Sequence, residues 1–249
     1  MKHHHRSHRF LVPIGLGIYL IILGLLVWNR YQLFTSPADS QTPPVQPIVK
    51  TSPPPTQPVT PTNLPAEFFL QVPFTVQAPI GVWDATHEEA CEEASLLMVE
   101  HYKTGLAFSS PVTTESEIQS LINWETSRGY KVDLTAAELK KIATDRFSLS
   151  SRVIDNPTVA DIKTAIASGH LVVVPAAGQV LGNPHFTAPG PVYHMLVIIG
   201  YDPTDFITND PGTRYGQNYH YPYSQLTNAI HDWDPADILS GLPRVVVFD

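Results

Sequence analysis

The sequence predicts an α+β domain in which N-terminal helices pack on a mostly antiparallel sheet. Two observations favour this fold class. Capped helical segments fill the first part of residues 66–249, and short apolar or β-branched runs bounded by Gly, Pro or Asp fill the second part. Helices followed by strands, rather than alternating with them, are typical of an α+β domain.

The expected helices each have a recognisable start or end. Ser, Thr or Asp before an apolar repeat, with an acid three residues later, is the pattern of a capping box, and Gly commonly follows a helix. The segment that contains Cys91 ends at Gly105. The three later helices are expected to start at Thr114, Thr135 and Thr158.

The expected strands are short and apolar. Runs of β-branched residues bounded by turn-forming residues indicate strands. Four segments have this character: 171–177, 193–202, 206–210 and 244–249. The strands at 193–202 and 206–210 are close in sequence, so we expect them to pair as antiparallel neighbours.

The N-terminal region predicts a membrane anchor. Residues 1–10 are basic, and residues 11–28 contain no charged side chain. As a helix, residues 11–28 would cover roughly 27 Å, close to the hydrocarbon thickness of a bilayer. More basic residues precede this span than follow it closely, which places the N-terminus in the cytoplasm. A cleaved signal peptide is the alternative, although its apolar core typically has only about 7–15 residues.

Residues 29–65 form the expected linker, which would be extracytoplasmic. Ten of the residues in 36–65 are prolines, among Thr, Gln and Ser. Such a composition cannot bury a core and favours an extended polyproline II conformation. We therefore expect a single-pass protein of the cell membrane, with the domain at 66–249 held outside.

The charge of the domain limits its partners. Residues 66–249 contain 10 basic and 22 acidic residues, a formal net charge of −12. Nucleic acid is therefore not an expected partner, because its phosphates require a basic surface. The sequence does not indicate the oligomeric state.

The single cysteine is compatible with three roles: an inert buried residue, an intermolecular link or a reactive nucleophile. Cys91 cannot form an internal disulfide, and a helix N-terminus or a neighbouring imidazolium lowers the pKa of a thiol. A peptidase of this kind also needs a histidine as base, a group that orients it, and an oxyanion donor. His194 at the start of one predicted strand, Asp210 at the end of the next, and Gln77 are candidates, with Asn209 as a substitute for Asp210.

The order of these motifs resembles a known family. "VPFTVQ", "ACEEAS", "YHMLVIIGYD" and "NDPG" follow one another as in papain-like cysteine peptidases of the double-glycine leader peptidase type, the "peptidase C39-like" branch. The resemblance covers about residues 69–249. It implies a papain-like fold with Cys91 as nucleophile, His194 as base, Asp210 as orienting residue and Gln77 as oxyanion donor. It implies a peptide or protein substrate and no metal or organic cofactor.

The acids around Cys91 leave its place in the helix open. Thr86 with Glu89 matches a capping box that would put Cys91 one turn inside a helix. The family pattern favours a break near residues 88–90, with the main helix starting at Cys91. The acids oppose thiolate formation directly, and they predict a cleft that prefers basic peptides.

Other functions are compatible with the same residues. A catalytically silent domain of this fold could bind peptides or envelope polymer, and an acyl-transferring enzyme could use the same triad on another acceptor. "HEEAC" is also similar to the zinc-binding HExxH motif, with His101 or His194 as a further ligand. That pattern lacks a downstream zinc signature, so the sequence favours a thiol hydrolase that cleaves amide bonds through a thioester.

Overall fold

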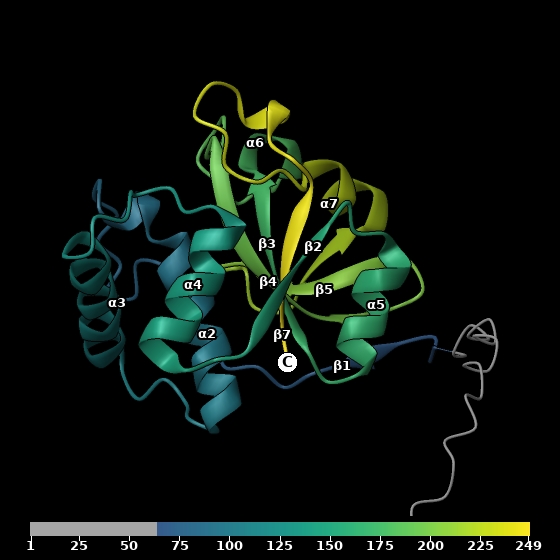
Figure 1. Ribbon diagram of the computed structural model, residues 1–249, viewed down its shortest axis with the longest axis horizontal. Helices are drawn as coiled ribbons and strands as arrows, with labels where there is room; N and C mark the ends of the chain where they lie inside the picture. The colour runs from purple at the N-terminus through teal and green to yellow at the C-terminus, as the bar shows by residue number, and fades with distance from the viewer. Residues whose placement is uncertain (1–63) are drawn as a thin grey trace, which may run out of the picture. The chain divides into compact units, whose positions relative to one another are not determined.

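The computed structural model describes residues 64–249 (Figure 1). The predicted basic tail, the membrane span at 11–28 and nearly all of the linker lie outside the described residues. Within residues 64–249, no helix combines the length and the hydropathy that a membrane crossing requires.

An antiparallel sheet of seven strands forms the centre of the domain. Its order is β2-β7-β3-β4-β5-β6, and β1 pairs with β4. Every pairing is antiparallel, which confirms the predicted sheet. The strands are β1 (Phe68–Phe69), β2 (Ser151–Asp155), β3 (Leu171–Ala177), β4 (Tyr193–Tyr201), β5 (Asp205–Asn209), β6 (Tyr219–Pro222) and β7 (Arg244–Phe248).

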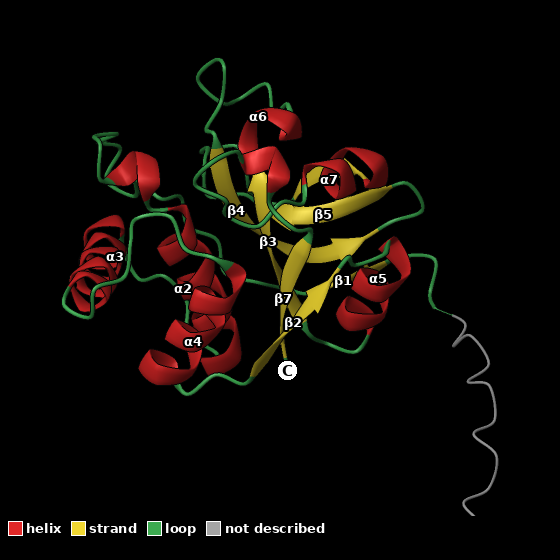
Figure 2. Ribbon diagram, turned by 45° about the horizontal axis from the view of Figure 1, so that its top comes forward, coloured by secondary structure: helices red, strands yellow, loops and turns green. Residues whose placement is uncertain are grey.

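Helices cover both faces of this sheet. Helices α2, α3 and α4 gather on one side, and α5 and α7 lie on the other (Figures 1 and 2). The α-helices are α2 (Cys91–Thr104), α3 (Pro111–Thr126), α4 (Ala136–Phe147), α5 (Val159–Ala167), α6 (Gly178–Leu181) and α7 (Tyr223–Ala229). Two short 3₁₀ helices are η1 (His87–Glu89) and η2 (Ile238–Ser240).

Strand β4 is buried on both faces because it separates two apolar cores. Met195 and Val197 belong to the core under α2, α3 and α4, whereas Leu196 and Ile198 belong to the core under α5 and α7. Successive side chains of a strand point to opposite faces. A strand covered on both faces therefore needs apolar residues at nearly every position, which explains the continuous apolar run that predicted it.

Three of the predicted helix starts are confirmed, and one is wrong. Thr135 and Thr158 form capping boxes, and α2 starts at Cys91. Helix α3 starts at Pro111 instead of Thr114, because Ser110 accepts a hydrogen bond from the Thr113 N–H and Pro suits the first helical position.

Strands β1, β2 and β6 were not among the expected strands. In β6, Tyr219 and Tyr221 turn inward while His220 faces solvent. This edge strand lies within the tyrosine-rich segment 213–223, and the alternation of inward and outward residues matches the period of a strand.

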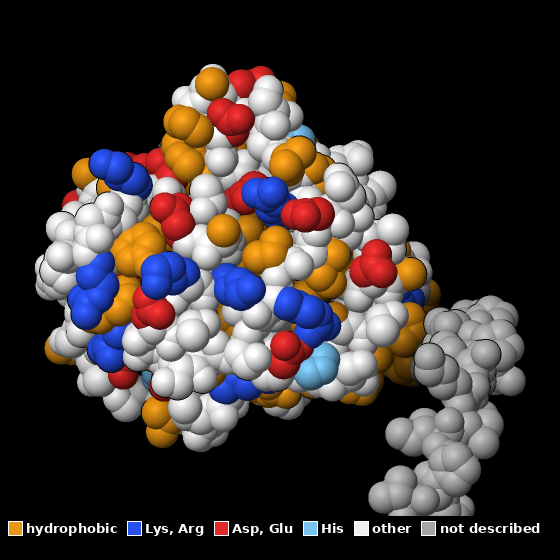
Figure 3. All heavy atoms as spheres, viewed as in Figure 1, with side chains coloured by type: hydrophobic (Ala, Val, Ile, Leu, Met, Phe, Trp, Pro, Cys, Tyr) orange, Lys and Arg blue, Asp and Glu red, His pale blue; other side chains and the backbone are white. Residues whose placement is uncertain are grey.

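The face of the domain in Figure 3 carries mixed charges. Lys and Arg side chains are spread among acidic and apolar ones on that face, without a continuous basic patch.

Candidate active site

His194 and Asp210 form a buried hydrogen-bonded pair at one end of the sheet. His194 is the second residue of β4, and Asp210 directly follows β5. Because these strands are antiparallel neighbours, the start of one lies beside the end of the other. His194 Nε2 is 2.8 Å from Asp210 Oδ1, and the two side chains are 1% and 0% exposed. The structure therefore brings together two of the predicted site residues.

Asp210 accepts hydrogen bonds from several further groups. Its Oδ2 accepts from the Tyr221 hydroxyl at 2.6 Å and from Asn183 Nδ2 at 3.1 Å. Its Oδ1 also accepts from the Gly212 N–H at 2.9 Å. Tyr221 on β6 and Asn183 in the segment after α6 were not predicted from the sequence. The strand alternation of 219–222 is the signal that could have pointed Tyr221 inward.

These donors keep Asp210 ionised. Burial alone would raise the pKa of Asp210, but the charge of His194 and the hydrogen bonds of His194, Tyr221 and Gly212 hold it below its usual value. An ionised carboxylate accepts a hydrogen bond from the Nε2–H of His194. His194 Nδ1 is then the ring nitrogen that remains for proton transfer.

Two glycines let the turn after β5 approach this pair closely. A Cβ at Gly216 would lie 1.8 Å from the Asp210 carbonyl oxygen, and a Cβ at Gly212 would lie 2.9 Å from His194 Cε1. The Asp210 N–H donates to the Gly216 carbonyl at 2.9 Å. The turn thus fixes both the backbone and the carboxylate of Asp210.

Cys91 is the first residue of α2, which confirms the break predicted before it. Ala90 separates η1 from α2 with φ −95° and ψ 28°. His87 holds η1 in place, since its Nδ1 lies 2.7 Å from Asp84 Oδ1 and its Nε2 lies 2.9 Å from Glu115 on α3. The capping box that Thr86 and Glu89 suggested does not form, because Thr86 makes no side-chain cap.

The thiol of Cys91 contacts Glu92 and β4. Its Sγ–H donates to Glu92 Oε2 at 2.9 Å, and its Sγ accepts the Met195 N–H at 3.3 Å. Met195 follows His194 directly, so the thiol lies against the same part of β4. Within residues 64–249, no hydrogen bond joins Cys91 to His194. Burial and then the charge and hydrogen bond of Glu92 raise the pKa of Cys91 well above its usual value, which favours the thiol.

Gln77 lies beside η1, and its side-chain amide is hydrogen bonded to that helix. Its Nε2 donates to the carbonyls of His87 at 2.7 Å and Glu88 at 3.0 Å, so both amide hydrogens have partners. Its Oε1 is buried and has no hydrogen-bond partner among the described residues. In this conformation Gln77 supports η1, and donation to an oxyanion would require it to release one of these carbonyls.

A cavity of about 300 Å³ opens beside His194. Gln77, Glu88, Glu89 and Trp83 contribute to its wall, and so does Phe186, whose ring meets the His194 ring edge-on at 5.2 Å. The carboxylates of Glu88 and Glu89 have no hydrogen-bond or ion-pair partner among the described residues. The cavity is therefore aromatic and acidic next to a candidate catalytic histidine.

Three buried acidic residues lie on α2 and α3 close to Cys91. Glu92, Glu93 and Glu125 are 2%, 5% and 4% exposed. Burial, and then the charge of Glu93, raises the pKa of Glu92 well above its usual value. Burial raises the pKa of Glu93 to about 7, and burial together with the charge of Glu93 raises the pKa of Glu125 to about 10. These pKa values describe a cluster that is largely protonated at neutral pH.

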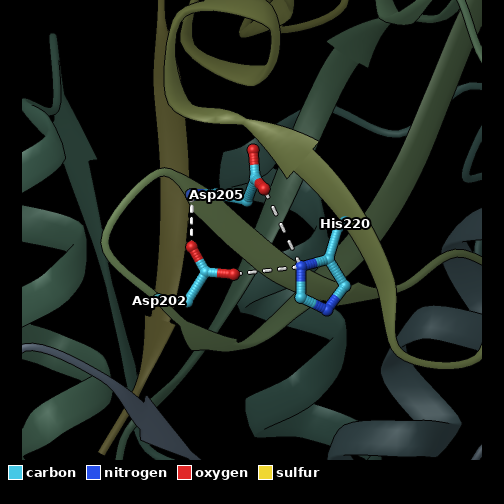
Figure 4. Close-up of side chains that lie close together, drawn as sticks. All are labelled: Asp202, Asp205 and His220. Atoms are coloured by element: carbon cyan, nitrogen blue, oxygen red, sulfur yellow. Dashed lines mark hydrogen bonds and ion pairs between the residues drawn. The ribbon is translucent and has the colours of Figure 1, made fainter.

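A separate group of potential metal ligands lies where the β4–β5 hairpin meets β6, which carries His220. His220 Nδ1 is 3.2 Å from Asp202 Oδ2 and 3.9 Å from Asp205 Oδ2 (Figure 4). In the part of the chain that the structure describes, this is the one group of at least three such ligands, and it does not contain Cys91. Asp202 Oδ1 accepts the N–H groups of Thr204 and Asp205, so this carboxylate also stabilises the hairpin turn.

The zinc arrangement considered for "HEEAC" does not assemble. His87 is paired with acids on both ring nitrogens, and His101 stacks on Phe108 at 4.1 Å. Neither imidazole lies in a group of three ligands with Cys91 or His194 within residues 64–249.

The fold places a thiol at a helix start against β4, the strand that carries the His194 of the buried His–Asp pair. A family model described as "Peptidase_C39 like family" matches residues 69–237. The chain therefore belongs to the Peptidase_C39 like family, which confirms the family resemblance seen in the sequence.

A solved structure supports the fold. The chain is similar to the crystal structure of a candidate C39-like peptidase from Bacillus anthracis, with a TM-score of 0.50 and 16% identity. The alignment covers 74% of this chain and 97% of that one. No curated protein matches the sequence significantly. At this identity the likeness supports the mixed helix and antiparallel-sheet fold alone.

Proposed function

We propose that this protein is a thiol peptidase that uses Cys91 as nucleophile, His194 as general base and acid, and Asp210 to orient the histidine. The observation that carries the proposal is the buried His194–Asp210 pair beside a helix that starts at the only cysteine. A His oriented by a carboxylate next to a nucleophile is the common logic of such sites.

The reaction follows from the free ring nitrogen of His194. The thiol proton passes to His194 Nδ1, and the thiolate attacks the peptide carbonyl carbon. His194 returns the proton to the leaving amine as the C–N bond breaks, which leaves a thioester on Cys91. His194 then takes a proton from water, and hydrolysis of the thioester releases the acid and the thiol.

The oxyanion hole is the part of this site whose hydrogen-bond donors are least preorganised. The Cys91 backbone N–H at the start of α2 is one donor, because the first N–H groups of a helix have no intrahelical partner. The Gln77 amide is the second donor in this proposal. Its hydrogen bond to the Glu88 carbonyl, the longer of the two at 3.0 Å, is the one it would exchange for the oxyanion.

The substrate in this proposal is a peptide or protein, bound in the cavity beside His194.

In addition, we propose that residues 11–28 anchor the protein in the cell membrane, with the N-terminus in the cytoplasm and the catalytic domain outside. Protease added to intact cells should then remove the domain, whereas a protected domain would contradict this orientation.

The first experiment measures alkylation of Cys91 against pH in wild type, His194→Ala and Cys91→Ala. A Cys–His ion pair should react rapidly at about pH 5–6, where an ordinary thiol with a pKa of about 8.5 is nearly all protonated. His194→Ala should abolish that fast reaction. If wild type and His194→Ala react at the same rate and both titrate near the ordinary thiol pKa, His194 does not activate Cys91.

One observation favours a second candidate, a silent peptide-binding domain of the same fold. In this structure the Cys91 thiol hydrogen bonds Glu92 and not His194. A silent domain would bind peptides equally well as Cys91→Ala and would release no cleaved product. An active peptidase would lose all cleavage with that substitution, and analysis of the products would separate hydrolysis from acyl transfer.

A further inference from the structure

The carboxyl group of Glu92 touches the reacting sulfur atom. Glu92 Oε2 lies 2.9 Å from Cys91 Sγ, and Glu92 Oε1 accepts the Leu134 N–H at 3.2 Å. Glu92 and Cys91 are 2% and 4% exposed. No Lys, Arg or His side chain pairs with Glu92 among residues 64–249. This carboxyl group is therefore confined to a thiol and a single peptide N–H.

The protonation state of Glu92 decides which form of Cys91 fits beside it. A carboxylate can only accept from Cys91, so it holds the sulfur as a thiol and repels a thiolate. A carboxylic acid has an O–H that can donate to a thiolate. The Met195 N–H donates to the sulfur from the other side and favours the thiolate too.

The surroundings favour the neutral form of Glu92. The ionisable groups that interact with Glu92 are Cys91 and Glu93 on α2, Glu125 on α3 and Tyr193 on β4. Tyr193 in turn interacts with Asp133 and Asp232, and it precedes His194 on β4. Of these, only His194 can carry a positive charge. Burial and the negative charge of Glu93 therefore both oppose ionisation of Glu92.

We propose that Glu92 is a proton-controlled switch on the nucleophile: as a neutral acid it donates its Oε2–H to the Cys91 thiolate, and as a carboxylate it takes the thiol hydrogen bond and holds Cys91 inactive. This inference rests on the proposed cysteine-peptidase function, and it adds a catalytic residue that the predicted set of Cys91, His194, Asp210 and Gln77 does not include.

Protons balance through the cycle with Glu92 neutral throughout. The reactive state has a thiolate on Cys91, a proton on His194 Nδ1 and a proton on Glu92 Oε2. The thiolate attacks the carbonyl carbon, and His194 gives its proton to the amine as the C–N bond breaks. Water then gives one proton to His194 and its oxygen to the acyl carbon. The C–S bond breaks, and the thiolate returns to the hydrogen bonds of Glu92 and Met195.

The pH dependence of the reactive state then has a definite sign. Glu92 must be protonated, so reactivity falls as pH rises through the raised pKa of Glu92. At low pH, protonation of the thiolate sets the other limit. The reactive state therefore occupies a window whose alkaline side belongs to Glu92.

The test compares Glu92→Gln with Glu93→Gln in the full chain. The amide oxygen that Glu92→Gln introduces can still accept the Leu134 N–H, and the new NH₂ group can donate to the thiolate at every pH. Glu93→Gln is the matched control, because it replaces the adjacent buried acid, which makes no contact with the sulfur. The readouts are the rate of Cys91 alkylation and the ultraviolet absorbance of the thiolate, each measured against pH.

Wild type and Glu93→Gln should both lose reactivity on the alkaline side, and the midpoint of Glu93→Gln should lie at lower pH, because the charge of Glu93 no longer opposes ionisation of Glu92. Glu92→Gln should keep its reactivity there and react at least about tenfold faster than wild type one pH unit above the wild-type midpoint. Equal profiles for Glu92→Gln and wild type would overturn the proposal. If Glu92→Gln fails to fold, infrared spectra of wild type replace it. As pH rises, the infrared band of a protonated carboxyl group should then disappear with the same midpoint as the loss of Cys91 reactivity. If no such band is seen, the proposal is overturned.

Failure of the proposed function is distinguishable from failure of this inference. If His194→Ala leaves the alkylation profile of wild type unchanged while Glu92→Gln alters it, Glu92 controls the thiol and the peptidase triad is wrong. If His194→Ala removes the fast reaction while Glu92→Gln has no effect, the triad stands and the switch is wrong.

Discussion

Replacing Glu125 with Gln should stabilise the protein at alkaline pH. Glu125 is buried on α3, and its pKa is raised from 4.5 to about 10 by burial and by Glu93. The folded state therefore binds a proton that the unfolded state has released, so the free energy of unfolding falls as pH rises between these two values. The slope is about 1.4 kcal/mol per pH unit for one proton, which gives up to about 4 kcal/mol between pH 5 and pH 8.

The assay is urea unfolding of wild type and Glu125→Gln at several pH values from 5 to 8. Gln has the same shape, keeps an N–H donor toward Glu93 and does not titrate. The variant should lose less stability than wild type over this range, with the difference approaching the value above. Glu67→Gln, at an exposed position, is the control and should follow wild type. Parallel curves for wild type and Glu125→Gln would refute the reasoning, because Glu125 would then have similar pKa values in the folded and unfolded states.

Two further predictions concern the site. Asp210→Asn should lower kcat by about 10³–10⁴-fold with a smaller effect on KM, because an amide favours the wrong His194 tautomer. Tyr221→Phe removes one hydrogen-bond donor from the charged carboxylate and should lower kcat less. Equal losses of kcat in the two variants would contradict this ranking. The cavity carboxylates should select peptides with Lys or Arg, so Glu88→Gln with Glu89→Gln should remove that preference from a peptide library, and a wild-type library without it would contradict the idea.

The raised pKa values of the acids also bear on the choice between an active and a silent domain. A thiol whose hydrogen bond goes to Glu92 is unreactive in the conformation described here, although the His194–Asp210 pair is fully assembled. Protonation of Glu92, together with transfer of the thiol proton to His194, would reverse this arrangement by proton movements alone. The same arrangement of side chains therefore fits an enzyme whose nucleophile is controlled by pH.

Much of the architecture could be predicted from the sequence because its signals are local. Capping boxes at Thr135 and Thr158 indicated two helix starts, since a cap depends on residues three apart. The apolar run in 193–202 predicted a strand for the same reason. The prediction for the start of α3 was wrong because Ser110 and Thr114 both offer a cap. The structure uses Ser110, whose side chain accepts the Thr113 N–H, with Pro111 at the first helical position.

The sequence by itself predicted the α+β class and the family, and it pointed to the lone thiol Cys91, His194 and Asp210 as candidate site residues. Only the tertiary structure decided which groups meet. Tyr221 and Asn183 reach Asp210 from distant segments, and Gln77 uses its amide to hold the turn before Cys91. The thiol faces Glu92 rather than His194. Such contacts depend on how strands and helix ends come together in space, and on how burial shifts the balance of charge, which no local pattern of residues specifies.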